Sequence, residues 1–178
     1  MFEYYLSLGS NLGDKESNLL GGINSLTSCS KYIVDSYLKI QEVSSIYESR
    51  PIPDSDHPYF FNITLKATSN LDPYELLKVI KSIEKDLGRN TKEINQPRII
   101  DIDIIFAQKM GNNLLVKGKD NDEKLEIPHP RAHLRAFVLM PMIELDRDIV
   151  HPTINTTLKE ILSKLSFQTI VKLHRINY

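Results

Sequence analysis

The spacing of apolar side chains predicts alternating strands and helices along the first half of the chain. A short apolar run over residues 4–8 ends at Gly9 and is typical of a strand. A helix is expected to follow from about Lys15, because apolar side chains then recur at helical spacing. These side chains are Leu19, Leu20, Ile23 and Leu26. Residues 32–47 are rich in β-branched and aromatic side chains and predict a long strand, and another strand is expected over 60–68.

The clearest helix in the sequence lies between residues 72 and 88. Asp72 is a suitable N-cap, Pro73 suits the first helical position, and Glu75 completes a capping-box pattern. Gly88 is expected to end the helix. A single apolar stripe runs along it, formed by Leu76, Ile80, Ile83 and Leu87.

A strong strand signal over residues 99–106 completes the order strand, helix, strand, strand, helix, strand. This order is typical of the ferredoxin-like α+β fold, in which two helices pack on one face of an antiparallel sheet. Residues 108–124 form the most polar and turn-rich stretch of the chain. We expect an exposed loop or hairpin there.

The C-terminal third is expected to add two helices and a strand to this core. The helices are predicted between Arg131 and Leu145 and over 156–165, and the strand over 169–173. No repeat, low-complexity segment or linker divides the sequence. We therefore expect a single domain over residues 1–178.

Length, charge and cysteine content narrow the classes of function. The 178 residues suffice for one domain with a real core, and the net charge of −1 gives no basic field for nucleic acid. Cys29 is the only cysteine, so no disulfide can form within the chain. The first residues lack the pattern of a signal peptide, and no stretch approaches about 18 apolar residues. We expect a cytoplasmic monomer that binds neither nucleic acid nor membrane.

Two carboxylates stand two positions apart within the predicted strand 99–106. Because strand side chains alternate, Asp101 and Asp103 share one face, and the isoleucines at 100, 102 and 104 share the other. Unpaired burial of a carboxylate is strongly unfavourable, so the pair must meet water, cations or metal. Mg²⁺ typically uses one or two carboxylates together with substrate phosphates. A solvent-facing pair at the end of a sheet explains the same spacing.

Basic side chains flank this carboxylate pair on both sides in the sequence. They are Arg89, Lys92 and Arg98 before it, and His129, Arg131, His133 and Arg135 after it. Arginine forks match phosphate oxygens, so the combination favours a site for metal and polyphosphate. Solvated surface charges and a structural turn histidine are the plainer interpretation. The chain has no glycine-rich P-loop pattern, so any use of ATP does not depend on one.

An aromatic and amide cluster is the third candidate for binding. Phe60 and Asn62 share a face at the start of a predicted strand, and Phe137 follows the basic cluster. A flat heterocycle could stack on such rings, and the amide could both donate to it and accept from it. Core phenylalanines and a turn asparagine are the alternative interpretation.

Taken together, these motifs resemble those of the 6-hydroxymethyl-7,8-dihydropterin pyrophosphokinase family. The most specific part is Pro-Arg-x-x-Asp-x-Asp-Ile at 97–104, followed by Pro-His-Pro-Arg-x-x-x-Arg-x-Phe at 128–137. The other matching segments are LSLGSNLGD at 6–14, SSIYESRPI at 44–52, FFN at 60–62 and IEKDLGR at 83–89. They follow the order found in the family and extend over most of the chain.

The resemblance implies a ferredoxin-like enzyme of folate synthesis that transfers pyrophosphate from ATP to 6-hydroxymethyl-7,8-dihydropterin and releases AMP. Two Mg²⁺ ions would be held by Asp101 and Asp103. These aspartates would form the catalytic group with Arg89, Lys92 and Arg98. The residues implied to contact ATP are Glu84, Arg98, Ile104, Lys124, His129 and Arg135. Those implied to bind the pterin are Ser49, Pro51, Ile52, Phe60, Asn62 and Phe137.

Two functions from other classes remain open on the residues alone. The ferredoxin-like sheet is also an RNA-recognition scaffold, although the aromatic-rich ribonucleoprotein motif is missing here. A non-catalytic domain that senses a small molecule is the other alternative. It would need no carboxylate pair surrounded by cations.

Overall fold

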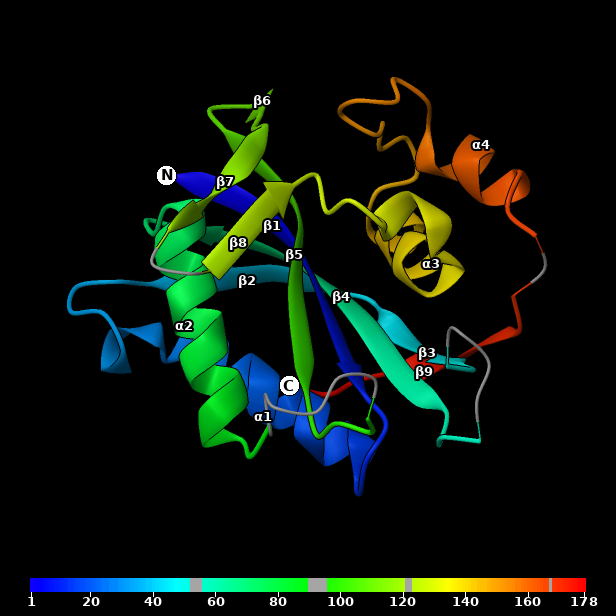
Figure 1. Ribbon diagram of the computed structural model, residues 1–178, viewed down its shortest axis with the longest axis horizontal. Coiled ribbons are helices and arrows are strands. Elements are labelled where there is room, and N and C mark those ends of the chain that lie inside the picture. The colour runs from blue at the N-terminus through cyan, green and yellow to red at the C-terminus, as the bar shows by residue number, and fades with distance from the viewer. Residues whose placement is uncertain (52–55, 90–95, 121–122, 167) are drawn as a thin grey trace.

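The chain folds around an antiparallel sheet, described here from a computed structural model over residues 1–51, 56–89, 96–120, 123–166 and 168–178 (Figure 1). The order of its strands is β6-β5-β1-β4-β3-β9, and β2 also pairs with β4. Their bounds are β1 Phe2–Ser10, β2 Leu38–Val43, β3 Ser45–Ser49, β4 Phe60–Ser69, β5 Asp101–Lys109, β6 Asn112–Asn113 and β9 Ile170–Arg175. The first four predicted strands therefore occupy the neighbouring positions of a ferredoxin-like sheet, and the fold class is confirmed.

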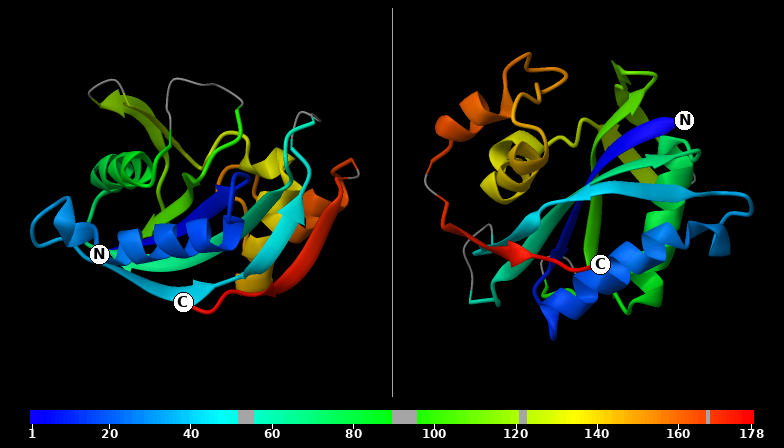
Figure 2. Two further views of the ribbon diagram at one scale, coloured as in Figure 1. Left: turned by 90° about the horizontal axis from the view of Figure 1, so that it is seen from below. Right: turned by 180° about the vertical axis from the view of Figure 1, so that it is seen from behind.

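Two pairs of helices cover the two faces of this sheet (Figures 1 and 2). The pair predicted from the first half of the sequence is α1 (Lys15–Thr27) and α2 (Pro73–Asp86). The pair on the opposite face is α3 (Ala136–Leu145), which follows a short 3₁₀ turn at Ala132–Leu134, and α4 (Leu158–Ser163). In the described part of the chain no helix is both long and apolar enough to cross a membrane.

The expected single strand over residues 32–47 is wrong, because this segment begins with a loop and then forms two shorter strands. A 3₁₀ turn at Cys29–Lys31 leads into a loop, and the strands β2 and β3 are separated by Ser44. The Ser44 hydroxyl accepts a hydrogen bond from the backbone N–H of Thr64 at 2.9 Å. A side-chain oxygen thus takes a position in the ladder that a backbone carbonyl normally holds, and this interrupts the strand.

The polar segment 108–124 contains a hairpin, as expected. Its strands β7 (Val116–Asp120) and β8 (Glu123–Ile127) form a separate two-stranded sheet. The hairpin lies beside β5, close to the carbonyl of Ile105, which accepts a hydrogen bond from the His129 N–H at 2.9 Å. This contact fixes where the chain leaves the hairpin.

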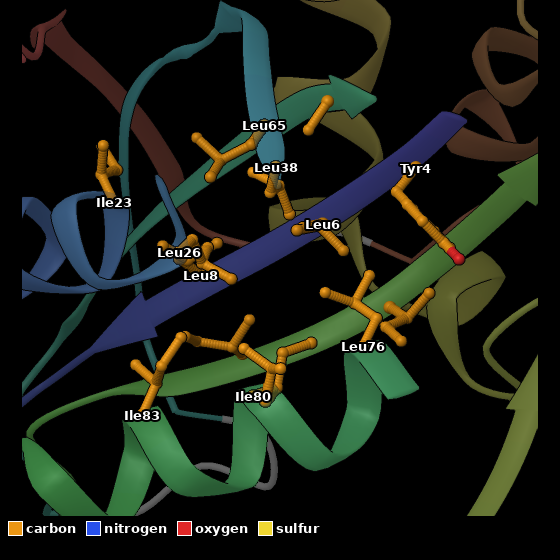
Figure 3. Packing of buried hydrophobic residues seen from close by; sticks show 14 of the residues in the cluster. Tyr4, Leu6, Leu8, Ile23, Leu26, Leu38, Leu65, Leu76, Ile80 and Ile83 are labelled. Carbon is orange, nitrogen blue, oxygen red and sulfur yellow. The ribbon is translucent and has the colours of Figure 1, made fainter. Parts of the chain in front are cut away.

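Side-chain alternation along β1 divides the core between the two faces, and Figure 3 shows the part that packs with α1 and α2. Tyr4, Leu6 and Leu8 pack with the apolar stripes of α1 and α2, whereas Tyr5 packs with α3 and α4. The buried residues of the stripes are Leu19, Ile23, Leu26, Leu76, Ile80 and Ile83, all of which the sequence pattern had indicated.

Helix α2 begins and ends with well-defined capping structures. Asp72 accepts hydrogen bonds from the N–H groups of Tyr74 and Glu75, and the Glu75 carboxylate accepts one from the Asp72 N–H. At the other end Gly88 has a φ of 92°. Its N–H bonds to the Lys85 carbonyl at 3.0 Å, and the Arg89 N–H bonds to the Glu84 carbonyl at 2.8 Å. This pair of bonds is a Schellman motif, and it turns the chain back toward the helix.

Gly88→Ala is expected to lower the free energy of unfolding by about 1–2 kcal/mol, because a side chain at positive φ is strained. The added Cβ would also lie 3.2 Å from Ile99 Cδ1. Gly21→Ala is the matched control, since Gly21 lies within α1 and its Cβ would meet only the Leu87 side chain at 3.5 Å. The control is expected to stabilise the protein by about 0.5–1 kcal/mol. Urea unfolding measures both, and equal effects would contradict the assignment of the turn.

Candidate active site

The register of the sheet places several predicted site residues in one row. Asp101 on β5 lies opposite Gly9 on β1, which in turn lies opposite Asn62 on β4. Tyr47 on β3 continues the row beyond Asn62. Asp103 lies in the next row. Ile102 and Ile104 are buried with α1 and α2, so both carboxylates face the other side of the sheet, as alternation predicted.

Asp101 is held by two guanidinium groups. Arg89 Nη1 lies 2.7 Å from Asp101 Oδ1, and Arg98 Nη1 lies 2.9 Å from Asp101 Oδ2. Both arginines are partly buried, with 18% and 24% of their side chains exposed. These short, charge-assisted contacts compensate the carboxylate of Asp101.

Asp103 has weaker compensation, although it stands beside a second negative charge. Its nearest basic partners are Arg135 Nη1 at 3.8 Å and His129 Nε2 at 3.9 Å, both beyond hydrogen-bonding distance. Desolvation, followed by repulsion from Asp101, raises the pKa of Asp103 to about 6. Asp103 is therefore the less well compensated of the two carboxylates.

His129 is a neutral donor in this setting. Its Nδ1 accepts a hydrogen bond from the Arg131 N–H at 3.2 Å, so the proton of the neutral ring is on Nε2, toward Asp103. Burial, with the nearby charges of Arg135 and Arg131, lowers the pKa of His129 to about 4. At neutral pH the imidazole can offer an N–H to an anion without adding a charge.

Glu84 is fully buried on α2 behind the carboxylate pair. It accepts hydrogen bonds from the Ile102 N–H at 2.8 Å, from Lys81 Nζ at 2.9 Å and from the Arg89 guanidinium. Burial raises the pKa of Glu84, and these three donors act against that rise. The structure thus places Glu84 as a support of the site rather than as a group exposed to a ligand.

Gly9 separates the carboxylate of Asp101 from an amide in this row. Asn62 is 3% exposed and donates to the Ser49 hydroxyl at 2.9 Å and to the Tyr47 carbonyl at 3.1 Å. Its Oδ1 stands over Gly9, where an added Cβ would approach it to 3.3 Å, and Phe60 lies 3.7 Å from the same point. Any side chain at position 9 would fill this space, so the glycine keeps it open.

Phe137 lies in the first turn of α3, half-buried beside the site. The Arg135 guanidinium lies 5.6 Å from the centre of its ring, within the range of a cation–π contact. The start of α3 therefore brings together the aromatic ring of Phe137 and the guanidinium group of Arg135, a group that suits phosphate oxygens.

Asn11 was missed as a contributor to the site. It is 1% exposed, and its Oδ1 accepts from the Arg98 N–H at 2.8 Å while its Nδ2 donates to the Pro58 carbonyl at 3.2 Å. It therefore ties the segment that carries Arg98 to the segment before Phe60. The available signal was the asparagine of the Gly-Ser-Asn-Leu-Gly turn, which lies within the matching segment 6–14.

The remaining predicted residues are placed less centrally. Pro51 is buried just after β3, and Lys124 is exposed on β8. The Ile104 side chain is buried in the core with α2, so only its backbone can face a ligand at the carboxylate face. Ile52 and Lys92 lie outside the described residues.

The donor set of the site fits Mg²⁺ together with phosphate. Within the described ranges no group of three or more His, Cys, Asp and Glu side chains could hold a metal by itself. Mg²⁺ does not need such a group, because it keeps waters and takes phosphate oxygens alongside one or two carboxylates. The weakly compensated carboxylate of Asp103, beside that of Asp101, is of the kind that a divalent cation would neutralise.

Comparison with known proteins gives a consistent result. Residues 5–147 match the family described as 7,8-dihydro-6-hydroxymethylpterin-pyrophosphokinase. The chain is 37% identical over 160 residues to the 2-amino-4-hydroxy-6-hydroxymethyldihydropteridine pyrophosphokinase of Aquifex aeolicus, covering 90% of each chain. It is 38% identical over 172 residues to the folic acid synthesis protein FOL1 of Dictyostelium discoideum.

The relatives differ greatly in length. The alignment with the Dictyostelium protein covers 97% of this chain but only 23% of that protein, and the one with the Pneumocystis carinii protein fol1 covers 20% of it. Among solved structures, a Plasmodium falciparum HPPK-DHPS chain has a TM-score of 0.66 at 19% identity, covering 92% of this chain and 45% of that one. At this identity the structural likeness supports the fold.

The two aspartates are expected to respond in opposite ways to the same substitution. Asp101→Asn leaves Arg89 and Arg98 poorly paired and should lower the free energy of unfolding by about 1–3 kcal/mol. Asp103→Asn should raise the free energy of unfolding at neutral pH. The folded-state pKa of Asp103 exceeds that of an unfolded aspartate. The contribution of this carboxyl group to the free energy of unfolding therefore falls as the pH rises from about 4 to about 6.

Urea unfolding at neutral pH without added divalent cation measures both variants. Equal losses of stability would contradict the unequal compensation of the two carboxylates.

Proposed function

The chain belongs to the 7,8-dihydro-6-hydroxymethylpterin-pyrophosphokinase family, and on this basis we propose the reaction that its site performs. It transfers the pyrophosphoryl group of ATP to the hydroxymethyl oxygen of 6-hydroxymethyl-7,8-dihydropterin. The products are the pterin diphosphate and AMP, and the reaction belongs to folate biosynthesis. We also propose that it acts as a monomer, since all the residues assigned to the site come from one chain.

The row across the sheet is the observation that carries this proposal. Asp101, Gly9 and Asn62 lie on adjacent strands, so the amide and the carboxylate are two strand spacings apart, about 10 Å. A flat bicyclic ring over Gly9 can therefore contact Asn62 at one end and direct its hydroxymethyl group toward Asp101 at the other. Phe60 lies at Gly9 and Phe137 lies next to Arg135, and both aromatic rings suit the faces of the ligand ring.

The basic side chains suit the nucleotide on the other side of the carboxylates. Arg98 and Arg135 offer forked donors for phosphate oxygens, and neutral His129 offers an N–H. Each of these three side chains lies within 4 Å of an oxygen of Asp101 or Asp103. Phosphates bound by these residues would therefore be positioned next to the pair.

Asp101 and Asp103 would hold Mg²⁺, with two ions expected from the family. When bound, Mg²⁺ would neutralise phosphate charge and make the substrate hydroxyl more acidic. The residues of the chain orient the two substrates and stabilise the charge of the phosphate chain, as positioning and electrostatics dominate phosphoryl transfer. The hydroxyl oxygen bonds to the β-phosphorus and loses its proton, while the bond from that phosphorus to the α–β bridging oxygen breaks and AMP leaves.

The assay that tests this function is chromatography of nucleotides from ATP, Mg²⁺ and the purified protein. AMP release is expected only when 6-hydroxymethyl-7,8-dihydropterin is present, and Asp103→Asn should reduce it by at least about 100-fold, the scale for a lost group that stabilises transferring charge. Gly21→Ala serves as the active control. ADP in place of AMP would mean ordinary γ-phosphoryl transfer, and pterin binding without turnover would mean a sensing domain. Either result would overturn the proposal.

Gly9→Ala is expected to weaken pterin binding about tenfold, because its Cβ would lie 3.3 Å from Asn62 Oδ1 and 3.7 Å from Phe60, where the ring is placed. Nucleotide binding should be unchanged, since the phosphate-binding side chains lie on segments that precede and follow β5. Calorimetry with each ligand separately measures this. An equal loss for both ligands would contradict the placement of the pterin over Gly9.

A further inference from the structure

We propose that Glu84 is a positioning residue that keeps Arg89 in the site when a metal ion takes Asp101. This inference rests on the proposed function, because it concerns the state with Mg²⁺ and nucleotide. In the structure the Arg89 guanidinium contacts two carboxylates, Glu84 and Asp101. Metal binding at Asp101 would remove one of these partners and leave the other.

The end of α2 forces Glu84 and Arg89 together regardless of Asp101. In the Schellman motif the Arg89 N–H bonds to the Glu84 carbonyl, so these two residues occupy the positions whose side chains meet. Such positions commonly hold two apolar side chains. Here they hold an ion pair whose side chains are 0% and 18% exposed.

Glu84 is itself held firmly enough to act as an anchor. Its carboxylate accepts from the Ile102 N–H, which lies between the two aspartates on β5. Lys81, one turn earlier on α2, adds a second cation at 2.9 Å. The side chain thus joins the helix end to the strand segment that carries both metal-binding candidates, and its burial leaves it no competing water.

Arg98 differs from Arg89 in the number of carboxylates that it contacts. Arg98 pairs with Asp101, and among the described residues no second carboxylate pairs with Arg98. When metal takes Asp101, Arg98 is released toward phosphate, whereas Arg89 stays on Glu84. Without Glu84, Arg89 would depend on Asp101 alone and would compete with the metal for it.

The test is the Mg²⁺ dependence of binding of a non-hydrolysable ATP analogue, measured by calorimetry. Glu84→Gln keeps the shape and an acceptor for Ile102 but loses the charge, and it is expected to need about tenfold more Mg²⁺ for half-saturation. Glu75→Gln, the same substitution in the capping box of the same helix, should leave the Mg²⁺ requirement unchanged. A shift of equal size in both would mean a general effect of helix stability and would overturn the inference.

Two double variants separate anchoring from a simple change in charge. Lys81→Gln with Glu84→Gln restores the net charge without restoring the anchor, so its Mg²⁺ requirement should stay high. Arg89→Gln with Glu84→Gln removes the competitor and should need less Mg²⁺ than Glu84→Gln alone. Recovery in the Lys81 double variant, with none in the Arg89 one, would overturn the inference.

Gly88→Ala extends the test if Glu84→Gln does not fold. It disturbs the turn that holds Arg89 on Glu84 and leaves every charge in place, so the Mg²⁺ requirement should rise in the same direction. A wild-type protein that binds no analogue would overturn the proposed function. A wild type that binds it, with an unchanged Mg²⁺ requirement in Glu84→Gln or, where that variant is unfolded, in Gly88→Ala, would overturn this inference alone.

Discussion

Repulsion between the carboxylates of Asp101 and Asp103 is the constraint on which the site depends. Strand alternation holds the two on one face, and the hydrogen-bonded neighbour β1 prevents them from separating. Asp101 is compensated by two arginines at short distance and Asp103 only by the more distant Arg135, while burial and repulsion from Asp101 raise the pKa of Asp103. The sheet thus holds two carboxylates close together, and a bound cation can relieve their repulsion, which lowers the stability of the free protein.

The surrounding elements divide two tasks between them. The sheet sets the distances along the row from Asp101 to Asn62, and Gly9 leaves the space between them open. Cationic side chains come instead from helix ends and connecting segments, where they can change partners. Asn11, which follows β1, bonds to the segment that carries Arg98 and to the segment before Phe60, so it fixes both relative to the sheet. This arrangement suits a reaction whose catalysis depends mainly on positioning and charge.

The sequence predicted the fold well where local signals agree with tertiary packing. The capping box, the apolar stripe and the terminal glycine of α2 all occur where the pattern placed them, because each depends on residues close in sequence. The break at Ser44 could not be predicted, since it depends on the Thr64 N–H, twenty residues away. The shared face of Asp101 and Asp103 followed from alternation alone. Their unequal compensation, the full burial of Glu84 and the role of Asn11 required the register of the sheet and the course of the turns.

The most direct test of this account is the anomalous diffraction signal from crystals grown with Mn²⁺ and a non-hydrolysable ATP analogue. The account predicts a peak between Asp101 and Asp103, with the phosphate chain beside Arg98 and Arg135. A peak elsewhere, or phosphates bound away from these carboxylates, would contradict the central role given to the pair.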